Sequence, residues 1–223
     1  MQKKYKAAIF DLDGTLLDTI RDLGGAVNWG LSQYGFPTLP MEHHINAVGQ
    51  GLRNYCAKSI PEEKVTDELL DVFVEKVKQH YNEFCTEETQ VYEGIYDLIA
   101  YMKEQGISVN ILSNKVDAIV EKLASHYFGE GVFDKAYGER ENIPRKPDPT
   151  AALSLAEELG MAPSEILFIG DSVYDVITGK RAGMCSVAVS WGYQSTDRLK
   201  AESPAFIAQT PYDIIEYLKE EKK

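Results

Sequence analysis

Cysteine is scarce in this chain of 223 residues. The three cysteines, at positions 56, 85 and 185, are widely spaced and form no C-x-x-C pair. An odd number of scattered cysteines argues against a disulfide framework and against a zinc site, and it is typical of reduced thiols inside a cell. We therefore expect a cytoplasmic protein.

Long apolar runs are also missing. A membrane-spanning helix needs about 18 or more apolar residues in a row, and no stretch of the sequence approaches that length. The apolar run from Ala7 to Phe10 ends at Asp11, which makes it too short for the core of a signal peptide. We expect no membrane partner.

Positive charge is in deficit as well. There are 23 lysines and arginines against 35 aspartates and glutamates, which gives a formal net charge of -12. A field of that sign repels the backbone of a nucleic acid, so we expect no nucleic-acid partner. Internal repeats and low-complexity segments are absent too, and the 44% of hydrophobic and 26% of charged residues are values of an ordinary globular protein.

The sequence does contain an alternation of short apolar runs with helical patterns. We expect strands over residues 5–10, 108–112, 134–137, 166–169 and 186–189, and helices over residues 18–34, 41–59, 66–85, 93–105, 116–127, 148–159, 172–182 and from 212 onward. Strands separated by helices of this length predict right-handed crossovers and a parallel sheet covered on both faces. Because residues 18–85 look wholly helical, the simplest architecture is one α/β domain with a helical insertion after its first strand.

Two carboxylates, Asp11 and Asp13, follow the first predicted strand. At this spacing both can reach into one crevice at the end of the strand, and Gly14 permits a tight turn. An ordinary Asp-Gly turn explains the same residues and stays open as an alternative. A calcium-binding EF-hand loop does not fit, because its sixth and twelfth positions would be Leu16 and Asp22.

Ser113, Asn114 and Lys115 follow the apolar run that ends at Leu112. A hydroxyl and the free backbone amides that open a helix can hold a phosphate group. The alternative is that Ser113 only caps the predicted helix.

Lys146 lies in a loop that Pro147 and Pro149 stiffen. The stiff loop could direct the lysine into the crevice. A single lysine in a loop is usually a solvated charge, and this alternative also stays open.

Gly170 and Asp171 follow the apolar run from Ile166 to Ile169, which is typical of a central parallel strand. Asp175 lies about one helical turn later. A phosphate-binding P-loop is excluded, because Gly179-Lys180 is followed by Arg181 and lacks the upstream glycine.

These residues form four motifs along the chain: residues 11–15, residues 113–115, Lys146, and residues 170–172 with Asp175. In this order and on these elements, the motifs resemble those of the haloacid dehalogenase superfamily of aspartate-dependent phosphohydrolases. The resemblance covers nearly the whole chain, and it is greatest to the phosphoglycolate phosphatases. It implies a Rossmann-like parallel-sheet core domain formed by residues 1–16 and 87–223. The helical segment of residues 17–86 resembles the small helical cap domain of the family.

The resemblance also implies roles for the motif residues. Asp11 would be the nucleophile that forms an aspartyl-phosphate, Asp13 the general acid and base, and Lys146 the cation that bridges Asp11 and the phosphate. The residues that bind the phosphate group would be Thr15, Ser113, Asn114 and Lys115. Mg²⁺ would be held by the Asp11 carboxylate, the Asp13 backbone carbonyl and the Asp171 carboxylate, with Asp175 orienting its surroundings.

The implied activity is Mg²⁺-dependent hydrolysis of a small phosphorylated metabolite by a monomer or homodimer. Four alternatives are weighed against a phosphoglycolate phosphatase: a phosphatase for a sugar phosphate, nucleotide or pyrophosphate, a sugar phosphomutase, a non-catalytic phosphate-binding module, and a haloacid dehalogenase. The module is disfavoured because both Asp11 and Asp13 are present. The dehalogenase is disfavoured by Asp13, since a departing halide needs no acid.

Arg53 is the candidate for substrate selection within the helical segment. It follows two glycines, Gly49 and Gly51, that let the backbone approach a ligand closely. Its guanidinium could bind a small carboxylate through two parallel hydrogen bonds. A solvated arginine after a loop is the simpler alternative.

Overall fold

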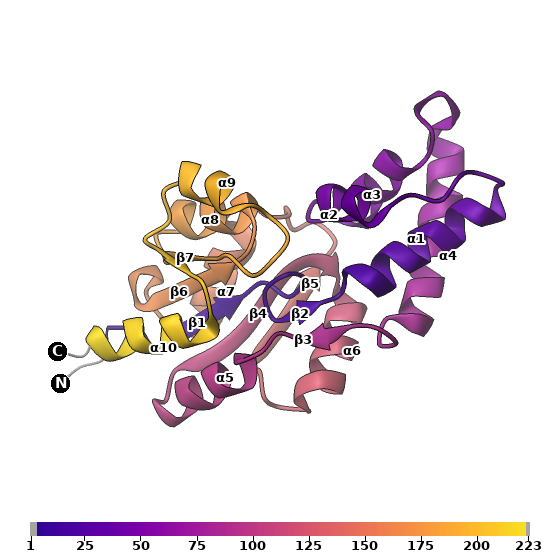
Figure 1. Cartoon of the computed structure of the whole chain (residues 1–223). Helices are drawn as coiled ribbons and strands as arrows, with labels where there is room; N and C mark the ends of the chain where they lie inside the picture. Colours follow the sequence, from indigo (N-terminus) through magenta and orange to yellow (C-terminus); the bar gives the residue numbers. More distant parts are fainter. Residues whose placement is uncertain (1–3, 222–223) are drawn as a thin grey trace.

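The computed structural model describes residues 4–221. Six parallel strands form a sheet in the order β5-β4-β1-β6-β7-β8 (Figure 1). They are β1 (Ala7–Phe10), β4 (Ser108–Val116), β5 (Lys135–Glu139), β6 (Ile166–Gly170), β7 (Cys185–Val189) and β8 (Phe206–Ala208). The strand order reverses at β1, so the carboxyl ends of β4, β1 and β6 form the crevice where open parallel sheets bind ligands. The predicted α/β fold is confirmed.

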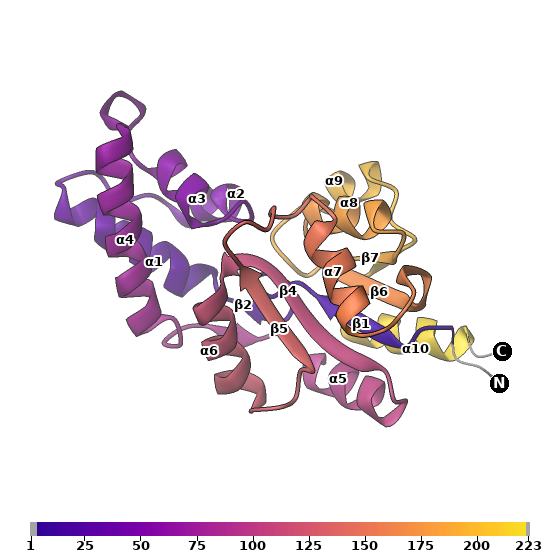
Figure 2. The same ribbon diagram turned by 180° about the vertical axis from the view of Figure 1, so that it is seen from behind.

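Helices cover both faces of this sheet (Figure 2). On one face lie α5 (Ile95–Glu104), α6 (Asp117–Phe128) and α10 (Pro211–Glu220), and on the other α7 (Thr150–Glu158) and α8 (Val173–Arg181). Side chains of β1 alternate between the faces: Ala8 and Phe10 pack with the first group, whereas Ala7 and Ile9 pack with α7. The short helix α9 (Thr196–Ala201) connects β7 to β8.

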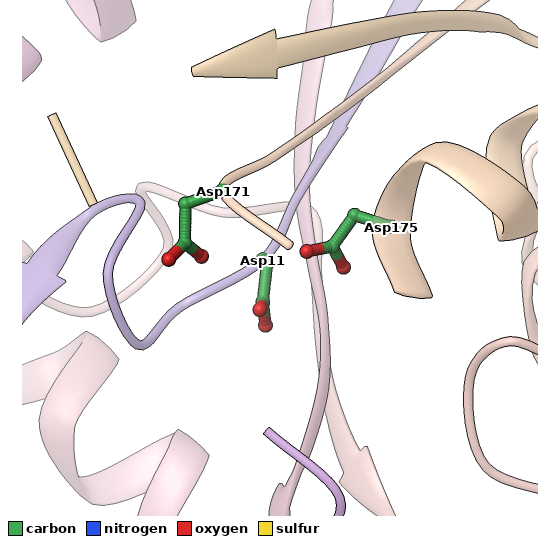
Figure 3. Close-up of side chains that lie close together, drawn as sticks. All are labelled: Asp11, Asp171 and Asp175. Carbon is green, nitrogen blue, oxygen red and sulfur yellow. The ribbon is translucent and has the colours of Figure 1, made fainter. Parts of the chain in front are cut away.

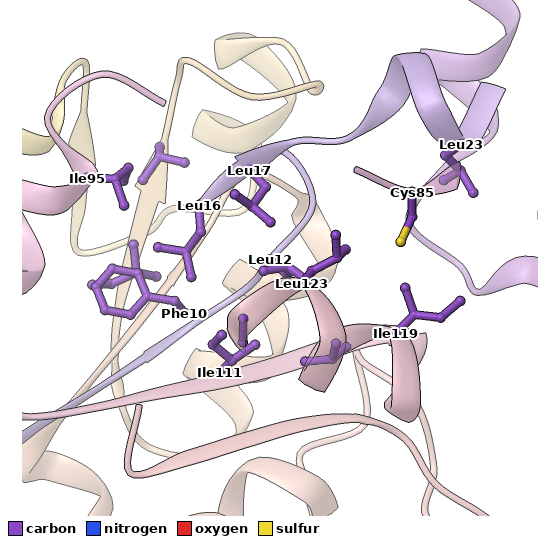
Figure 4. Close-up of a cluster of buried hydrophobic side chains, with 14 of the residues drawn as sticks. Phe10, Leu12, Leu16, Leu17, Leu23, Cys85, Ile95, Ile111, Ile119 and Leu123 are labelled. Atoms are coloured by element: carbon purple, nitrogen blue, oxygen red, sulfur yellow. The ribbon is translucent and has the colours of Figure 1, made fainter. Parts of the chain in front are cut away.

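The helical segment stands to one side of the sheet (Figure 1). Its helices are α1 (Ile20–Gln33), α2 (Met41–Ala47), α3 (Leu52–Ser59) and α4 (Asp67–Phe84). They lie between β2 (Leu17–Asp18) and β3 (Gln90–Val91), which pair antiparallel. One hydrophobic cluster continues from Phe10 and Leu12 at the sheet to Leu23 and Cys85 in the segment (Figure 4). The division into a core and a cap domain stays a prediction.

Two expected boundaries are wrong, and both concern the crevice. The helix expected over residues 41–59 is broken into α2 and α3, because Gly49 and Gly51 adopt φ values of 109° and 84° that interrupt it. The strand expected to end at Leu112 continues to Val116, so Ser113 does not cap a helix. The short elements β2, β3, β8 and α9 were not expected.

The structure shows the state of the three cysteines and the character of the helices. Cys56, Cys85 and Cys185 are all free. Within residues 4–221, no helix has the length and apolar character that crossing a membrane requires.

Candidate active site

Three carboxylates meet at the crevice (Figure 3). Asp11 follows β1, Asp171 follows β6, and Asp175 lies in the first turn of α8. One oxygen of each lies within 4.8 Å of the others, and all three side chains are buried. Burial, together with the neighbouring carboxylates, raises the pKa of Asp11 to about 6 and raises the pKa of Asp171 well above its usual value. The cluster therefore concentrates negative charge that needs cationic partners.

Lys146 is one such partner. Its Nζ lies 2.9 Å from Asp11 Oδ1 and 2.6 Å from Asp175 Oδ1. Burial alone would lower the pKa of this lysine, but Asp11 and Asp175 outweigh burial and raise the pKa above its usual value. The side chain of Asn114 holds the loop in place, because Oδ1 accepts a hydrogen bond from Lys146 N at 2.9 Å and Nδ2 donates to Lys146 O at 3.0 Å. Lys146 is thus a buried, charged contact of Asp11 and not a solvated loop residue.

Both oxygens of Asp175 have partners inside the protein. Oδ2 accepts hydrogen bonds from Ser172 N at 3.0 Å and from Ser172 Oγ at 2.5 Å, which forms a capping box at the start of α8. Oδ1 accepts from Lys146. Asp175 is therefore fixed in position by local helix structure, and it in turn fixes Lys146.

Asp171 has no cationic partner among residues 4–221. It accepts hydrogen bonds from Thr15 Oγ1 at 3.2 Å and from Tyr193 N at 2.7 Å. A buried carboxylate that forms no ion pair, next to a second carboxylate with a raised pKa, fits a hard divalent cation, and Mg²⁺ prefers oxygen ligands of this kind. Asp11 and Asp171 are the side chains that would hold such an ion.

Gly14 has to lack a side chain for Asp171 to occupy this place. A Cβ at Gly14 would lie 2.3 Å from Asp171 Oδ2, and the φ of 80° is one that other residues rarely adopt. We expect Gly14→Ala to lower the free energy of unfolding by about 2–4 kcal/mol. Gly35→Ala is the matched control, because Gly35 has a φ of 67° but no atom within 4 Å of its Cβ position. Its cost should be the backbone strain alone, about 1 kcal/mol. Urea unfolding measures both, and equal losses would show that the contact with Asp171 is unimportant.

Asp13 lies outside this cluster and is held by different partners. Lys115 Nζ donates to Asp13 Oδ1 at 2.7 Å and to Oδ2 at 2.9 Å, and the Thr19 hydroxyl also donates to Oδ1. Asp11 and Asp13 line the same cavity, as their spacing at one strand end predicts. The two carboxylates therefore face one cavity from different surroundings, which is what two different chemical roles would require.

The other wall of the cavity comes from the helical segment. Its side chains are those of Leu23, Ile45, Val48, Leu52, Tyr55 and Tyr81. The loop between α2 and α3 touches β4 and α8: Gly49 O accepts from Asn114 Nδ2 at 3.0 Å, and Gln50 Nε2 donates to the Tyr174 hydroxyl at 2.6 Å. The segment thus covers the crevice in this structure.

Ser113, Asn114 and Lys115 line the cavity from the end of β4. Register pairs with β1 end at Ile111, and those with β5 stop at Leu112 and resume at Val116. The backbone amides of Ser113 and Asn114 therefore lie outside the paired register, whereas Lys115 N already donates to Ser113 Oγ at 3.3 Å. The first two amides can meet a ligand for this reason, and not because they open a helix.

Two predicted binding residues lie elsewhere. Arg53 does not line the cavity; it pairs with Asp67 and Asp71 of α4, and its side chain is 42% exposed. Leu52 faces the cavity, and the next helical residue points about 100° away from it. Thr15 is fully buried and directs its hydroxyl to Asp171 instead of lining the cavity.

Sequence reasoning misses Gly192 and Tyr193, which come soon after β7. Tyr193 N donates to Asp171, and its hydroxyl accepts from Thr19 N at 2.8 Å. A Cβ at Gly192 would lie 2.3 Å from Asp171 Cβ. The available signal was their place just past a predicted parallel strand, at the same edge of the sheet as Asp11 and Asp171.

Comparison with known proteins adds to this geometry. Residues 8–189 match the model of the haloacid dehalogenase-like hydrolase family. A phosphoglycolate phosphatase from Aquifex aeolicus is 29% identical over 96% of each chain, and one from Pseudomonas putida is 32% identical over 91% of this chain and 75% of its own. A provisionally assigned phosphoglycolate phosphatase from Lactobacillus delbrueckii subsp. bulgaricus, solved by crystallography, is 31% identical with a TM-score of 0.87, covering 96% of this chain and 98% of its own.

Proposed function

Since this chain belongs to the haloacid dehalogenase-like hydrolase family, we propose that it is a phosphatase of the phosphoglycolate phosphatase type, which hydrolyses a small phosphorylated metabolite. The observation that carries the proposal is the placement of Asp11. It is buried at the end of the central strand, bonded to Lys146, and faces the same cavity as Asp13. Two-step phosphate transfer needs a nucleophile and a proton donor that both reach one ligand, because the attacking and departing oxygens lie on opposite sides of phosphorus.

Asp11 acts as the nucleophile in this mechanism. Leu12 N, at 2.7 Å, and Lys146 both bind Oδ1, which leaves Oδ2 to attack phosphorus. The new bond from Oδ2 to phosphorus forms as the bond from phosphorus to the ester oxygen breaks, and Asp13 gives its proton to the departing oxygen. Asp13 then takes a proton from a water molecule whose oxygen attacks the aspartyl-phosphate, which releases inorganic phosphate and restores Asp11.

The remaining residues hold the transferred group. The Ser113 hydroxyl and the backbone amide of Asn114 donate to phosphoryl oxygens, and Lys146 offsets their charge. The Asp11 and Asp171 carboxylates and the Asp13 carbonyl would hold Mg²⁺, which would offset the negative charge of the three clustered carboxylates. Asp175 keeps Lys146 in place.

Phosphate release from a panel of substrates tests the proposal. The panel is 2-phosphoglycolate, a hexose monophosphate, a nucleoside monophosphate, pyrophosphate and p-nitrophenyl phosphate, each with Mg²⁺. We expect 2-phosphoglycolate to have the highest kcat/KM. A higher value for another substrate would assign the chain to that substrate instead, and isomerisation of the hexose phosphate without phosphate release would identify a mutase. Release from none of them would overturn the phosphatase assignment.

A further inference from the structure

The cavity contains very little positive charge. Among the residues of the described chain that line it, Lys115 is the only lysine, arginine or histidine. The wall contributed by the helical segment consists of apolar and aromatic side chains and of loop glycines. A negatively charged leaving group therefore has Lys115 as the cation on the described cavity wall, because Lys146 is not part of that wall.

Lys115 already binds a carboxylate in this structure. Its side chain is 5% exposed, and its ammonium contacts both oxygens of Asp13. In the proposed mechanism Asp13 bonds to the ester oxygen of the substrate. A group on the carbon next to that oxygen then lies on the side of the cavity where Lys115 is, because Lys115 and the ester oxygen contact the same Asp13 carboxylate.

Tyr81 lies beside the Lys115 ammonium and also lines the cavity. Its ring centroid lies 4.6 Å from Lys115 Nζ, and the residue lines the cavity while being 1% exposed. Its hydroxyl has no hydrogen-bond partner of normal geometry among residues 4–221. A buried hydroxyl without a partner is costly, so a ligand acceptor at this point would stabilise the site. Tyr55 lines the same cavity but differs, since its hydroxyl bonds to His44 Nδ1 at 2.6 Å.

We propose that Lys115 and the Tyr81 hydroxyl form the carboxylate-binding subsite of this enzyme, and that its substrates are small 2-phosphoryloxy carboxylates. The proposal rests on the proposed phosphatase function. It replaces Arg53 as the selecting residue, because Arg53 lies outside the cavity with its own acidic partners. The apolar wall formed by Leu23, Ile45 and Leu52 offers nothing to a long polyhydroxylated leaving group, which restricts the class to small acids.

The test compares 2-phosphoglycolate with carbamoylmethyl phosphate, in which an uncharged amide of nearly the same size replaces the carboxylate. Lys115→Met should lower kcat/KM for the acid about 10- to 100-fold more than for the amide. A loss shared by both substrates reports the contact of Lys115 with Asp13, so the ratio of the two values isolates carboxylate binding. Tyr81→Phe, which keeps the ring and removes only a contact of the hydroxyl with Thr19 that lacks normal hydrogen-bond geometry, should lower the ratio about 3- to 10-fold.

Two matched variants act as controls. Tyr55→Phe removes a hydroxyl from the same cavity, and Arg53→Gln removes the nearby surface cation; both should leave the acid-to-amide ratio at the wild-type value. Equal losses for acid and amide in Lys115→Met and in Tyr81→Phe would overturn the subsite. So would a shift of the ratio in Arg53→Gln alone. Failure of the phosphatase proposal looks different, since wild-type protein would then release no phosphate from either compound or from p-nitrophenyl phosphate.

Discussion

Asp11→Asn is expected to lower kcat by about 10,000-fold or more while leaving the protein folded. Asparagine preserves the shape of the side chain and can still accept the hydrogen bond from Lys146, but it cannot form an acyl-phosphate. Phosphate release from 2-phosphoglycolate measures the loss. Asp134→Asn is the control, because Asp134 is an exposed aspartate just before β5, at the amino ends of the parallel strands and so away from the crevice. Appreciable activity in Asp11→Asn would falsify the covalent mechanism.

The same variant should be more stable than the wild type when metal is absent. The pKa of Asp11 is raised to about 6 in the folded protein, mainly by burial, so the folded state favours the neutral carboxyl. The stability contributed by the neutral form is fully present below the unfolded pKa near 4 and is lost as the pH rises through about 6. Asparagine is neutral at every pH. The gain for Asp11→Asn should therefore reach up to about 3 kcal/mol at pH 7.5 and vanish near pH 4. Urea unfolding in a chelator measures it, and a gain that does not depend on pH would contradict this origin.

Removal of divalent metal is expected to abolish turnover, and Mg²⁺ is expected to restore it. Asp171 forms no ion pair within the described residues and shares its surroundings with Asp11 and Asp175, so the bare cluster repels an anionic substrate. Ca²⁺ should not replace Mg²⁺, because it takes more ligands at longer distances and would displace the nucleophile. Turnover after chelation, followed by addition of each ion, is the measurement. Full activity in the chelator would rule out the metal.

Metal binding can also be measured through the melting temperature, without an activity assay. Mg²⁺ should raise the Tm of the wild type and of Asp134→Asn, but not of Asp171→Asn, because an ion that binds only the folded state stabilises it. The pKa of Asp171 is raised by burial and by the nearby carboxylates, so protons compete with the ion. The Mg²⁺ concentration that gives half of the Tm shift should therefore increase as the pH is lowered. An unchanged Tm shift in Asp171→Asn would place the ion elsewhere.

The sequence by itself determined the fold class and the edge of the sheet that carries the chemistry. Short apolar runs separated by helical patterns predict parallel strands, and Asp11 and Asp171 each follow such a run. These are local properties, because alternation along a strand and the residue that follows it do not depend on distant parts of the chain. The resemblance to a known family adds that these motifs serve phosphate-ester chemistry, with the substrate left open.

Only the tertiary structure decided which side chains meet. Lys115 contacts Asp13 across a long separation in sequence, which no local pattern encodes. The contact of Lys146 with Asp11 is also long-range, and only the resemblance to a known family implied it. The error at Arg53 has the same physical origin: the glycine-rich loop shows that the backbone approaches something, but the rotation of α3 directs Leu52 to the cavity and Arg53 to acidic partners on α4. Partner choice depends on how separate elements dock, and docking is set by the packing of the whole core.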